Sequence, residues 1–316
     1  MSTPPRIAIV LPCYNEQEVL PSTAGTLLEL LDRFTAEGLV APDSYIMCSN
    51  DGSRDATASI IAELHVADTR VKGINLAHNR GQQAALLAGL MTVRERCDAA
   101  ITIDADLQDN PEMMRDMIKL FRDGTDIVFG VRASRDTDSR FKRWSAQTFY
   151  RFQNAMGLST VYNHADYRLM SRRALDILAQ YGESNIYLRG IMPDIGLKTA
   201  VVEYARTERT AGESKYPLGK MLSLGIDGIT SFTAKPMRMI FLVGLALLII
   251  DIIVAIWVLS AYLAGHTVSG WSSLMLSVWF LGSIILMAIG IVGEYIGKIF
   301  VEVKHRPRYN IMEEIF

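Results

Sequence analysis

Two long apolar runs near the C-terminus constrain this chain more than any other feature of its sequence. The first extends from residue 237 to about 264 and the second from 271 to about 296, with the short segment GHTVSG between them. Each run exceeds the roughly 20 helical residues that cross a bilayer core about 30 Å thick. Helices buried in a soluble core are the alternative, but such helices rarely stay apolar on every face for so long. We therefore expect a transmembrane helical hairpin over residues 236–300.

Cationic residues around the two runs predict how the hairpin is oriented. Lysines and arginines flank its outer ends: Lys235, Arg238, Lys298, Lys304, Arg306 and Arg308. The segment between the runs has only His266. Because short cytoplasmic flanks carry the excess of Lys and Arg, we expect a multi-pass protein of the cell membrane with both termini in the cytoplasm. The N-terminal RIAIVLP is too short for a signal peptide and is typical of a buried strand.

The remaining composition excludes several classes of protein. With 316 residues, half of them hydrophobic, the chain can bury one large core besides the hairpin. Cys13, Cys48 and Cys97 have no CxxC spacing, so we expect small core residues in a reducing compartment rather than disulfides or a zinc site. A net charge of -2 gives no indication of a nucleic-acid partner.

Strand and helix patterns alternate over the first 205 residues. Apolar runs predict strands at 7–11, 45–48, 73–76, 99–103 and 127–130, and helical periodicity fills the gaps, for example at 84–93 and 113–121. This alternation predicts an α/β domain with a largely parallel sheet and helices on both faces. Polar clusters follow four successive strands: PCYNEQE, SNDGSRD, AHNRGQQ and DADLQD. Ligands bind beyond the carboxyl ends of such strands, so these clusters are expected to form one site.

The fourth cluster contains Asp104 and Asp106, one residue apart. Their carboxylates would repel each other unless a cation or a donor-rich ligand lay between them. Oxygen ligands of this kind suit Mg²⁺ or Mn²⁺, and Mg²⁺ usually completes its shell with waters and phosphates. Asp109 has a simpler explanation, since Asp109 or Asn110 can cap the helix that begins at Pro111.

These motifs resemble a known family. IVLPCYNEQEVL, NDGSRDAT, NRGQQAALLAG and DADLQDNPE are similar, in order, to the signatures of family 2 glycosyltransferases with the A-type fold. NHADYRLMSRRAL, GESKYPLGKM and VGEYIGKIFVEVKHRPRY resemble more particularly the polyisoprenyl-phosphate glycosyltransferases, which include bactoprenol glucosyltransferases and enzymes of the dolichol-phosphate mannose synthase type. The resemblance covers nearly the whole chain. It implies a Rossmann-like cytoplasmic glycosyltransferase domain (1–205), an interfacial amphipathic segment (206–235), the hairpin (236–300) and a cytoplasmic tail (301–316).

The resemblance also implies roles for residues of the first two clusters. It assigns Pro12, Tyr14, Asn15 and Glu16 to the uridine-side wall of a nucleotide-sugar site, and Asp51 to the uracil base. Chemistry agrees for Asp51, since a carboxylate at a strand end can accept the uracil N3 proton. The alternative for Asp51 is a turn residue, because Asp-Gly is a common turn pair.

The next two clusters are assigned to the donor's phosphates. In the family, the D-x-D element binds the metal and the diphosphate, which here implies catalytic and metal-binding roles for Asp104 and Asp106. Gln108 is placed near the metal, and Gly81 would allow the backbone to approach the nucleotide closely. Asp55 fits better as a residue of a first helical turn, where the helix dipole favours it.

Asp166, in HADYRLM, matches the family position near the transferred sugar and the acceptor. It could act as a general base or orient sugar hydroxyls. A lipid phosphomonoester is already largely a dianion at neutral pH, so we favour positioning. Arg168 is assigned to the nucleotide-sugar site, and its alternative is a structural ion pair with Asp166.

Several cations could meet an acceptor phosphate: Arg132, Arg135, Arg206, Arg209 and Lys215. Three of them precede an amphipathic pattern (Leu218, Met221, Leu222, Ile226, Ile229 and Phe232) that suits a helix lying in the membrane interface. Any single surface arginine is as often a solvated charge as a phosphate ligand.

The resemblance therefore implies a cell-envelope enzyme that transfers a hexose or N-acetylhexosamine, with inversion, from a UDP-sugar to undecaprenyl phosphate. Glucose and N-acetylglucosamine stay equally open. A processive polysaccharide synthase is one alternative, although RFKRW has Arg140 where that class has Gln in Q-x-x-R-W. A catalytically inactive nucleotide-sugar scaffold is another, although D-x-D is intact. GEYIG and the intramembrane Asp251, which needs a partner, favour a homo-oligomer.

Overall fold

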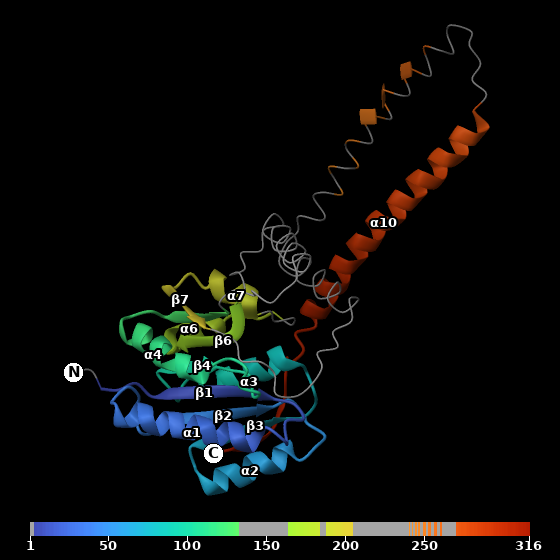
Figure 1. The fold of residues 1–316 in the computed structure, drawn as a ribbon. Helices are drawn as coiled ribbons and strands as arrows, with labels where there is room; N and C mark the ends of the chain where they lie inside the picture. Colours follow the sequence, from blue (N-terminus) through green and yellow to red (C-terminus); the bar gives the residue numbers. More distant parts are fainter. Residues whose placement is uncertain are drawn as a thin grey trace. The chain divides into compact units, whose positions relative to one another are not determined.

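The computed structural model describes residues 3–132, 164–183, 188–204 and 270–316, together with scattered residues between 240 and 260 (Figure 1). The chain divides into two compact units. The first comprises residues 1–150, 159–215 and 306–316, and the second comprises residues 151–158 and 216–305.

An eight-stranded sheet forms the centre of the first unit, in the order β7-β5-β6-β4-β1-β2-β3-β8. The strands are β1 (Ile7–Cys13), β2 (Tyr45–Asn50), β3 (Val71–Leu76), β4 (Ala99–Thr102), β5 (Ile127–Arg132), β6 (His164–Ser171), β7 (Thr199–Tyr204) and β8 (Ile311–Ile315). Neighbours among β1 to β4 pair in parallel, as do β5 and β7. β6 runs antiparallel to β4 and β5, and β8 runs antiparallel to β3. The sheet is therefore mixed, which corrects the expectation of a largely parallel sheet.

The five strands expected from apolar runs are all present, whereas β6, β7 and β8 are additional. β6 has the sequence HADYRLMS, in which buried charged residues interrupt the apolar pattern. β8 has the sequence IMEEI, and its middle residues are exposed. A strand at a sheet edge can expose charged side chains, and such charges also discourage pairing with other chains.

Helices connect the strands: α1 (Leu20–Ala36), α2 (Thr57–Ala67), α3 (Gln82–Val93), α4 (Met114–Arg122), α6 (Arg172–Leu178) and α7 (Leu188–Asp194). A 3₁₀ turn, Pro111–Met113, leads into α4. The side chain of Asn110 accepts the backbone N–H of Glu112, so Asn110 is the cap at this turn. The expected helices at 84–93 and 113–121 are thus confirmed to within about two residues.

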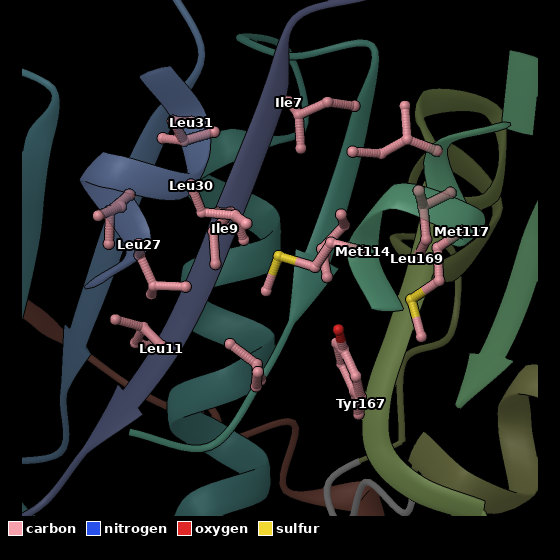
Figure 2. Close-up of a cluster of buried hydrophobic side chains, with 14 of the residues drawn as sticks. Ile7, Ile9, Leu11, Leu27, Leu30, Leu31, Met114, Met117, Tyr167 and Leu169 are labelled. Carbon is pink, nitrogen blue, oxygen red and sulfur yellow. The ribbon is translucent and has the colours of Figure 1, made fainter. Parts of the chain in front are cut away.

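The main core lies between α1 and the central strands, with α4 packed farther along the same face (Figure 2). Ile7, Ile9 and Leu11 alternate along β1 and point to this face, where Leu27 and Leu30 of α1 meet them. Burying each Leu or Ile side chain stabilises the fold by about 1.5–3 kcal/mol. α3 packs on the opposite face, where the Ser49 hydroxyl donates to the Ala85 carbonyl over 2.6 Å. This packing fixes the start of α3 at the carboxyl ends of β1 and β2.

All three cysteines are free and buried in the first unit. Burial raises the pKa of the Cys97 thiol to about 12, so this thiol stays neutral. The expectation of small core residues is confirmed.

α10 (Trp271–Val303) corresponds to the second expected span. Its segment Phe280–Val303 is strongly apolar, and in the part of the chain that the structure describes it is not buried. Within the described residues it is the one helix long and apolar enough to cross a membrane. Most of the first expected span, with Asp251, and the whole interfacial segment 206–235 lie outside the described residues.

Residues 301–316, expected to be a tail, contain the edge strand β8. β8 pairs with β3 from Gly73 opposite Ile315 to Leu76 opposite Ile311. The chain that follows α10 therefore returns to the sheet of the first unit.

Candidate active site

The loops after β1 and β2 are joined by side-chain hydrogen bonds. The Asn15 N–H donates to Ser53 Oγ over 2.9 Å, and the Arg54 N–H donates to Asn15 Oδ1 over 2.9 Å. The Glu16 N–H donates to Thr57 Oγ1 over 2.9 Å. Asn15 has a φ of 56°, a left-handed conformation that asparagine adopts more readily than most residues. The two motifs thus form one wall, which includes the predicted residues Asn15 and Glu16.

Two other predicted wall residues lie at the end of β1. Pro12 is half-buried, and Tyr14 is 42% exposed. The exposed ring of Tyr14 is accessible to a planar ligand, which is what a base-binding wall requires. Asp55 was expected in the first turn of a helix, but it precedes α2, which begins at Thr57. From there its carboxylate accepts the N–H and hydroxyl of Thr57.

Asp51 is 2% exposed and binds the loop that precedes α3. Its two oxygens accept the backbone N–H groups of Arg80 over 2.7 Å and of Gly81 over 2.8 Å. Burial raises the pKa of Asp51, and these two bonds oppose that effect. Asp51 therefore does more than form a turn, because its carboxylate holds the loop before α3 in place. Its role toward uracil stays a prediction.

Two glycines allow this loop to lie against the turn after β2. A Cβ on Gly52 would lie 2.8 Å from the backbone nitrogen of Asn79, so no side chain fits there. Gly81 has a φ of 88° and open space on the side where a Cβ would point. The backbone conformation at position 81 favours glycine. Its close approach to a nucleotide stays a prediction.

Amide side chains hold the D-x-D element after β4. Gln82 Nε2 donates to Asp104 Oδ1 over 2.8 Å. Gln108 donates to both oxygens of Asp106, from its backbone nitrogen over 3.3 Å and from Nε2 over 2.6 Å. The predicted metal neighbour Gln108 is therefore close to Asp106, with its amide nitrogen facing the carboxylate. Because a carboxylate oxygen has two lone pairs, these hydrogen bonds do not by themselves prevent the aspartates from binding an ion.

Negative charge is concentrated around this element. Burial raises the pKa of Glu16, and the charges of Asp106, Asp104 and Asp55 raise it further. No group of three or more His, Cys, Asp or Glu side chains in the described residues could hold a metal ion by itself. A pair of carboxylates nevertheless fits Mg²⁺ or Mn²⁺, because such ions commonly take their other ligands from substrate phosphates and water.

Asp166, on β6, is 6% exposed and surrounded by donors. It pairs with Arg168, which is 1% exposed, and with Arg189 of α7, whose Nη2 lies 3.1 Å from Oδ2. Gln83 Nε2 also donates to Oδ2, over 3.2 Å. The ion pair that we gave as the alternative for Arg168 is therefore present.

Three consecutive residues at the start of α3 connect the three carboxylates of the site. Gly81 binds Asp51, Gln82 binds Asp104, and Gln83 binds Asp166. The residues predicted to contact base, diphosphate and sugar therefore lie around one helix start.

Sequence reasoning missed Gln82, Gln83 and Arg189 as members of the site. The two glutamines were visible as a polar pair after Gly81, but nothing in the sequence links Arg189 to Asp166. The side chains of the predicted phosphate-binding residues Arg132, Arg135, Arg206, Arg209 and Lys215 lie outside the described residues, although the backbone of Arg132 ends β5.

Comparison with known proteins identifies the family. Residues 8–178, more than half of the chain, match the family described as Glycosyl transferase family 2. The chain belongs to glycosyltransferase family 2. This family 2 chain is 48% identical over 312 residues to an uncharacterized glycosyltransferase, YkoT, of Bacillus subtilis (strain 168), covering 99% of this chain and 93% of the relative. It is 39% identical over 311 residues to the bactoprenol glucosyl transferase of Shigella phage SfV, covering 98% and 99% of the two chains.

Among solved structures, this family 2 chain resembles glucosyl-3-phosphoglycerate synthase from Mycobacterium tuberculosis with a TM-score of 0.47 and 18% identity, over 72% of this chain and 78% of that chain. The family match shows that the protein is a glycosyltransferase. The matched residues include Asp51, Asp104, Asp106 and Asp166.

Proposed function

We propose that this family 2 glycosyltransferase transfers a hexose from a UDP-sugar to a polyprenyl phosphate at the cytoplasmic face of the membrane, with inversion at the anomeric carbon. The observation that carries the proposal is the helix start at Gly81, Gln82 and Gln83, which binds Asp51, Asp104 and Asp166 together. The acceptor and the sugar are supported by relatives named bactoprenol glucosyl transferase that match nearly the full length. Glucose is thus favoured, and N-acetylglucosamine is the second candidate.

The donor would bind along the carboxyl ends of β1, β2 and β4. Its uridine would lie between Tyr14 and Asp51, and its diphosphate would lie near Asp104 and Asp106. A divalent cation held by these two aspartates would neutralise the negative charge that grows on the departing diphosphate. The amides of Gln82 and Gln108 keep the aspartates in place for that purpose.

Asp166 would orient the transferred sugar and the attacking phosphate. Its oxygens already accept hydrogen bonds from two arginines and Gln83, so its geometry is fixed before substrate binds. Preorganised groups of this kind lower the barrier because they need not move during the reaction. Since the lipid phosphate is largely dianionic at neutral pH, the reaction needs no strong base.

The lipid acceptor requires a membrane-bound enzyme. α10 is apolar, and large side chains on it are more than half exposed, including Phe280, Leu286 and Ile296. Lipid would cover this surface. The same proposal includes the transmembrane hairpin with both termini in the cytoplasm and the interfacial helix. It also includes a homo-oligomer joined through Asp251.

Purified full-length protein tests the proposal directly. With undecaprenyl phosphate and Mg²⁺, a panel of UDP-sugars should show UDP release that depends on the lipid, with UDP-glucose the fastest, and mass spectrometry should find one hexose per lipid. NMR of the product should show the opposite anomeric configuration to the donor. Asp106→Asn is the negative control. A polymeric product would instead favour a processive synthase, and donor binding without lipid-dependent release would favour an inactive scaffold.

A further inference from the structure

A line of hydrogen-bonded side chains runs from the C-terminal strand to the proposed nucleotide wall. Asn75 Nδ2 donates to Glu313 Oε2 over 2.8 Å, and Asn50 Nδ2 donates to Asn75 Oδ1 over 2.9 Å. Ser53 donates to Asn50 Oδ1 from its hydroxyl over 2.5 Å and from its backbone nitrogen over 3.1 Å. Asn15 completes the line, since its N–H donates to Ser53 Oγ over 2.9 Å.

Every bond in this line points the same way, because a carboxylate that can only accept stands at one end and the Ser53 N–H, which can only donate, meets Asn50 at the other. Ionised Glu313 can only accept, so the amide of Asn75 must turn its NH₂ group toward it and its oxygen toward Asn50. Asn50 must then direct its own oxygen toward Ser53. An isolated asparagine amide has two orientations of similar shape, and its partners decide between them. Here Glu313 orients the Asn75 amide, and Asn75 and the Ser53 N–H favour the same orientation of the Asn50 amide.

The two amides are buried, whereas the residue that orients them is on the surface. Asn50 and Asn75 are 2% and 3% exposed, so a reversed amide would place two donors face to face without water nearby. Glu313 is exposed on β8. The segment around it is held to the first unit, because the Ala77 N–H donates to the Asn310 carbonyl over 2.9 Å and the Arg308 guanidinium donates to the Tyr181 carbonyl over 2.6 Å.

We propose that Glu313 is a positioning residue for the donor nucleotide: through Asn75 and Asn50 it fixes the orientation of Ser53 and so the conformation of the wall at Asn15. The C-terminal strand is in this way a part of the donor site, although Glu313 does not touch the nucleotide. The inference rests on the proposed function in one respect, namely that the wall at Asn15 binds the nucleotide.

Three variants of the full-length protein distinguish the effect of hydrogen-bond direction at residue 313 from a general effect of altering β8. Glu313→Gln keeps an acceptor oxygen for Asn75 and should behave as wild type. Glu313→Lys presents only donors and should reverse both amides. The NH₂ group of Asn50 would then face the Ser53 N–H, so two donors would meet. Glu314→Lys is the matched control. It makes the same change of charge, but the next residue of a strand points to the opposite face of the sheet.

Hydrogen exchange and nucleotide binding are the measurements. In Glu313→Lys, the backbone N–H groups of Ser53 and Asn15 should exchange at least tenfold faster, and calorimetry should show a Kd for UDP about tenfold higher, which corresponds to about 1.4 kcal/mol. The KM for the UDP-sugar should rise in parallel, while the KM for the lipid phosphate stays unchanged. Glu313→Gln and Glu314→Lys should leave all four quantities within about twofold of wild type.

A second substitution should repair the line. With Asn75→Asp added to Glu313→Lys, the aspartate accepts from both Lys and Asn50, so Asn50 returns to its native orientation and UDP binding should recover. Native exchange rates at Ser53 in Glu313→Lys, or equal losses in Glu313→Lys and Glu314→Lys, would overturn the inference. If wild type binds no UDP, the proposed function fails, and the exchange rates at Ser53 and Asn15 still decide the role of Glu313.

Discussion

The ion pair between Asp166 and Arg168 allows stability and catalysis to be measured separately. The two side chains are 5% and 1% exposed. In Asp166→Asn the buried guanidinium of Arg168 loses the negative charge of its partner, and breaking such a pair costs about 3–5 kcal/mol. Asparagine retains one acceptor oxygen, so we expect the lower end of that range, about 3 kcal/mol.

Arg189 provides the comparison, because it pairs with the same carboxylate from the surface. Its side chain is 40% exposed, and exposed ion pairs contribute about 0–1 kcal/mol. In a domain of this size, 1 kcal/mol shifts Tm by about 2–4 °C. Asp166→Asn should therefore lower the Tm by about 6–12 °C, and Arg189→Ala by less than about 4 °C.

Differential scanning calorimetry of the purified protein measures both shifts in Tm, and transfer of labelled sugar to undecaprenyl phosphate measures activity. The double variant Asp166→Asn, Arg168→Met removes both charges, and replacing a buried ion pair by apolar groups is often nearly neutral. It should regain most of the lost Tm but stay at least 100-fold less active than wild type. A Tm loss in Asp166→Asn no larger than in Arg189→Ala would refute the buried-charge reasoning. Recovery of activity in the double variant would show that transfer does not need Asp166.

Three further predictions follow from the carboxylates and from the acceptor. Asp106→Asn should lower kcat by about 100-fold or more with an unchanged Tm, as should excess chelator on wild type, and full activity in either case would contradict the metal site. Burial and the charges of Asp106, Asp104 and Asp55 raise the pKa of Glu16, so ionised Glu16 disfavours the folded state above its ordinary pKa. Glu16→Gln should thus raise the Tm at pH 7.5 and lose that gain as the pH falls below the ordinary pKa of glutamate, where Glu16 becomes protonated in both states. A gain independent of pH would argue against this cause. Arg209→Ala should raise the KM for lipid phosphate much more than the KM for UDP-sugar, and equal effects on both would show that the acceptor lies elsewhere.

The central strands, and the loops that carry the candidate site, follow from local sequence patterns. Apolar runs such as 7–11 can be satisfied only by burial, and a parallel strand buried on both faces has no need of polar residues. Polar residues directly after such runs must then lie at the carboxyl ends of the strands. For this reason the sequence alone predicts that Asp51, Asp104 and Asp106 lie at the same edge of the sheet.

Local pattern could not predict the strands that carry charge. β6 buries Asp166 and Arg168, which the sequence presents as polar residues, because each neutralises the other across two positions of the strand. β8 is a short strand with two glutamates, and it exists because the edge of β3 is open to it. For β6 the stabilising feature is the burial of an ion pair, and for β8 it is a strand far away in the sequence. Neither feature is visible in the local pattern of residues.

Which atoms meet within the site depends on how distant segments pack together. Gly81, Gln82 and Gln83 are adjacent in sequence, yet each binds a carboxylate from a different strand end, and the packing of α3 on the sheet sets that arrangement. Glu313 lies 238 positions from Asn75, and the hydrogen bond between them forms only because β8 pairs with β3 in one register. Hydrogen bonds require contact to within a few tenths of an ångström, and contact between distant segments is a property of the packed fold rather than of local sequence.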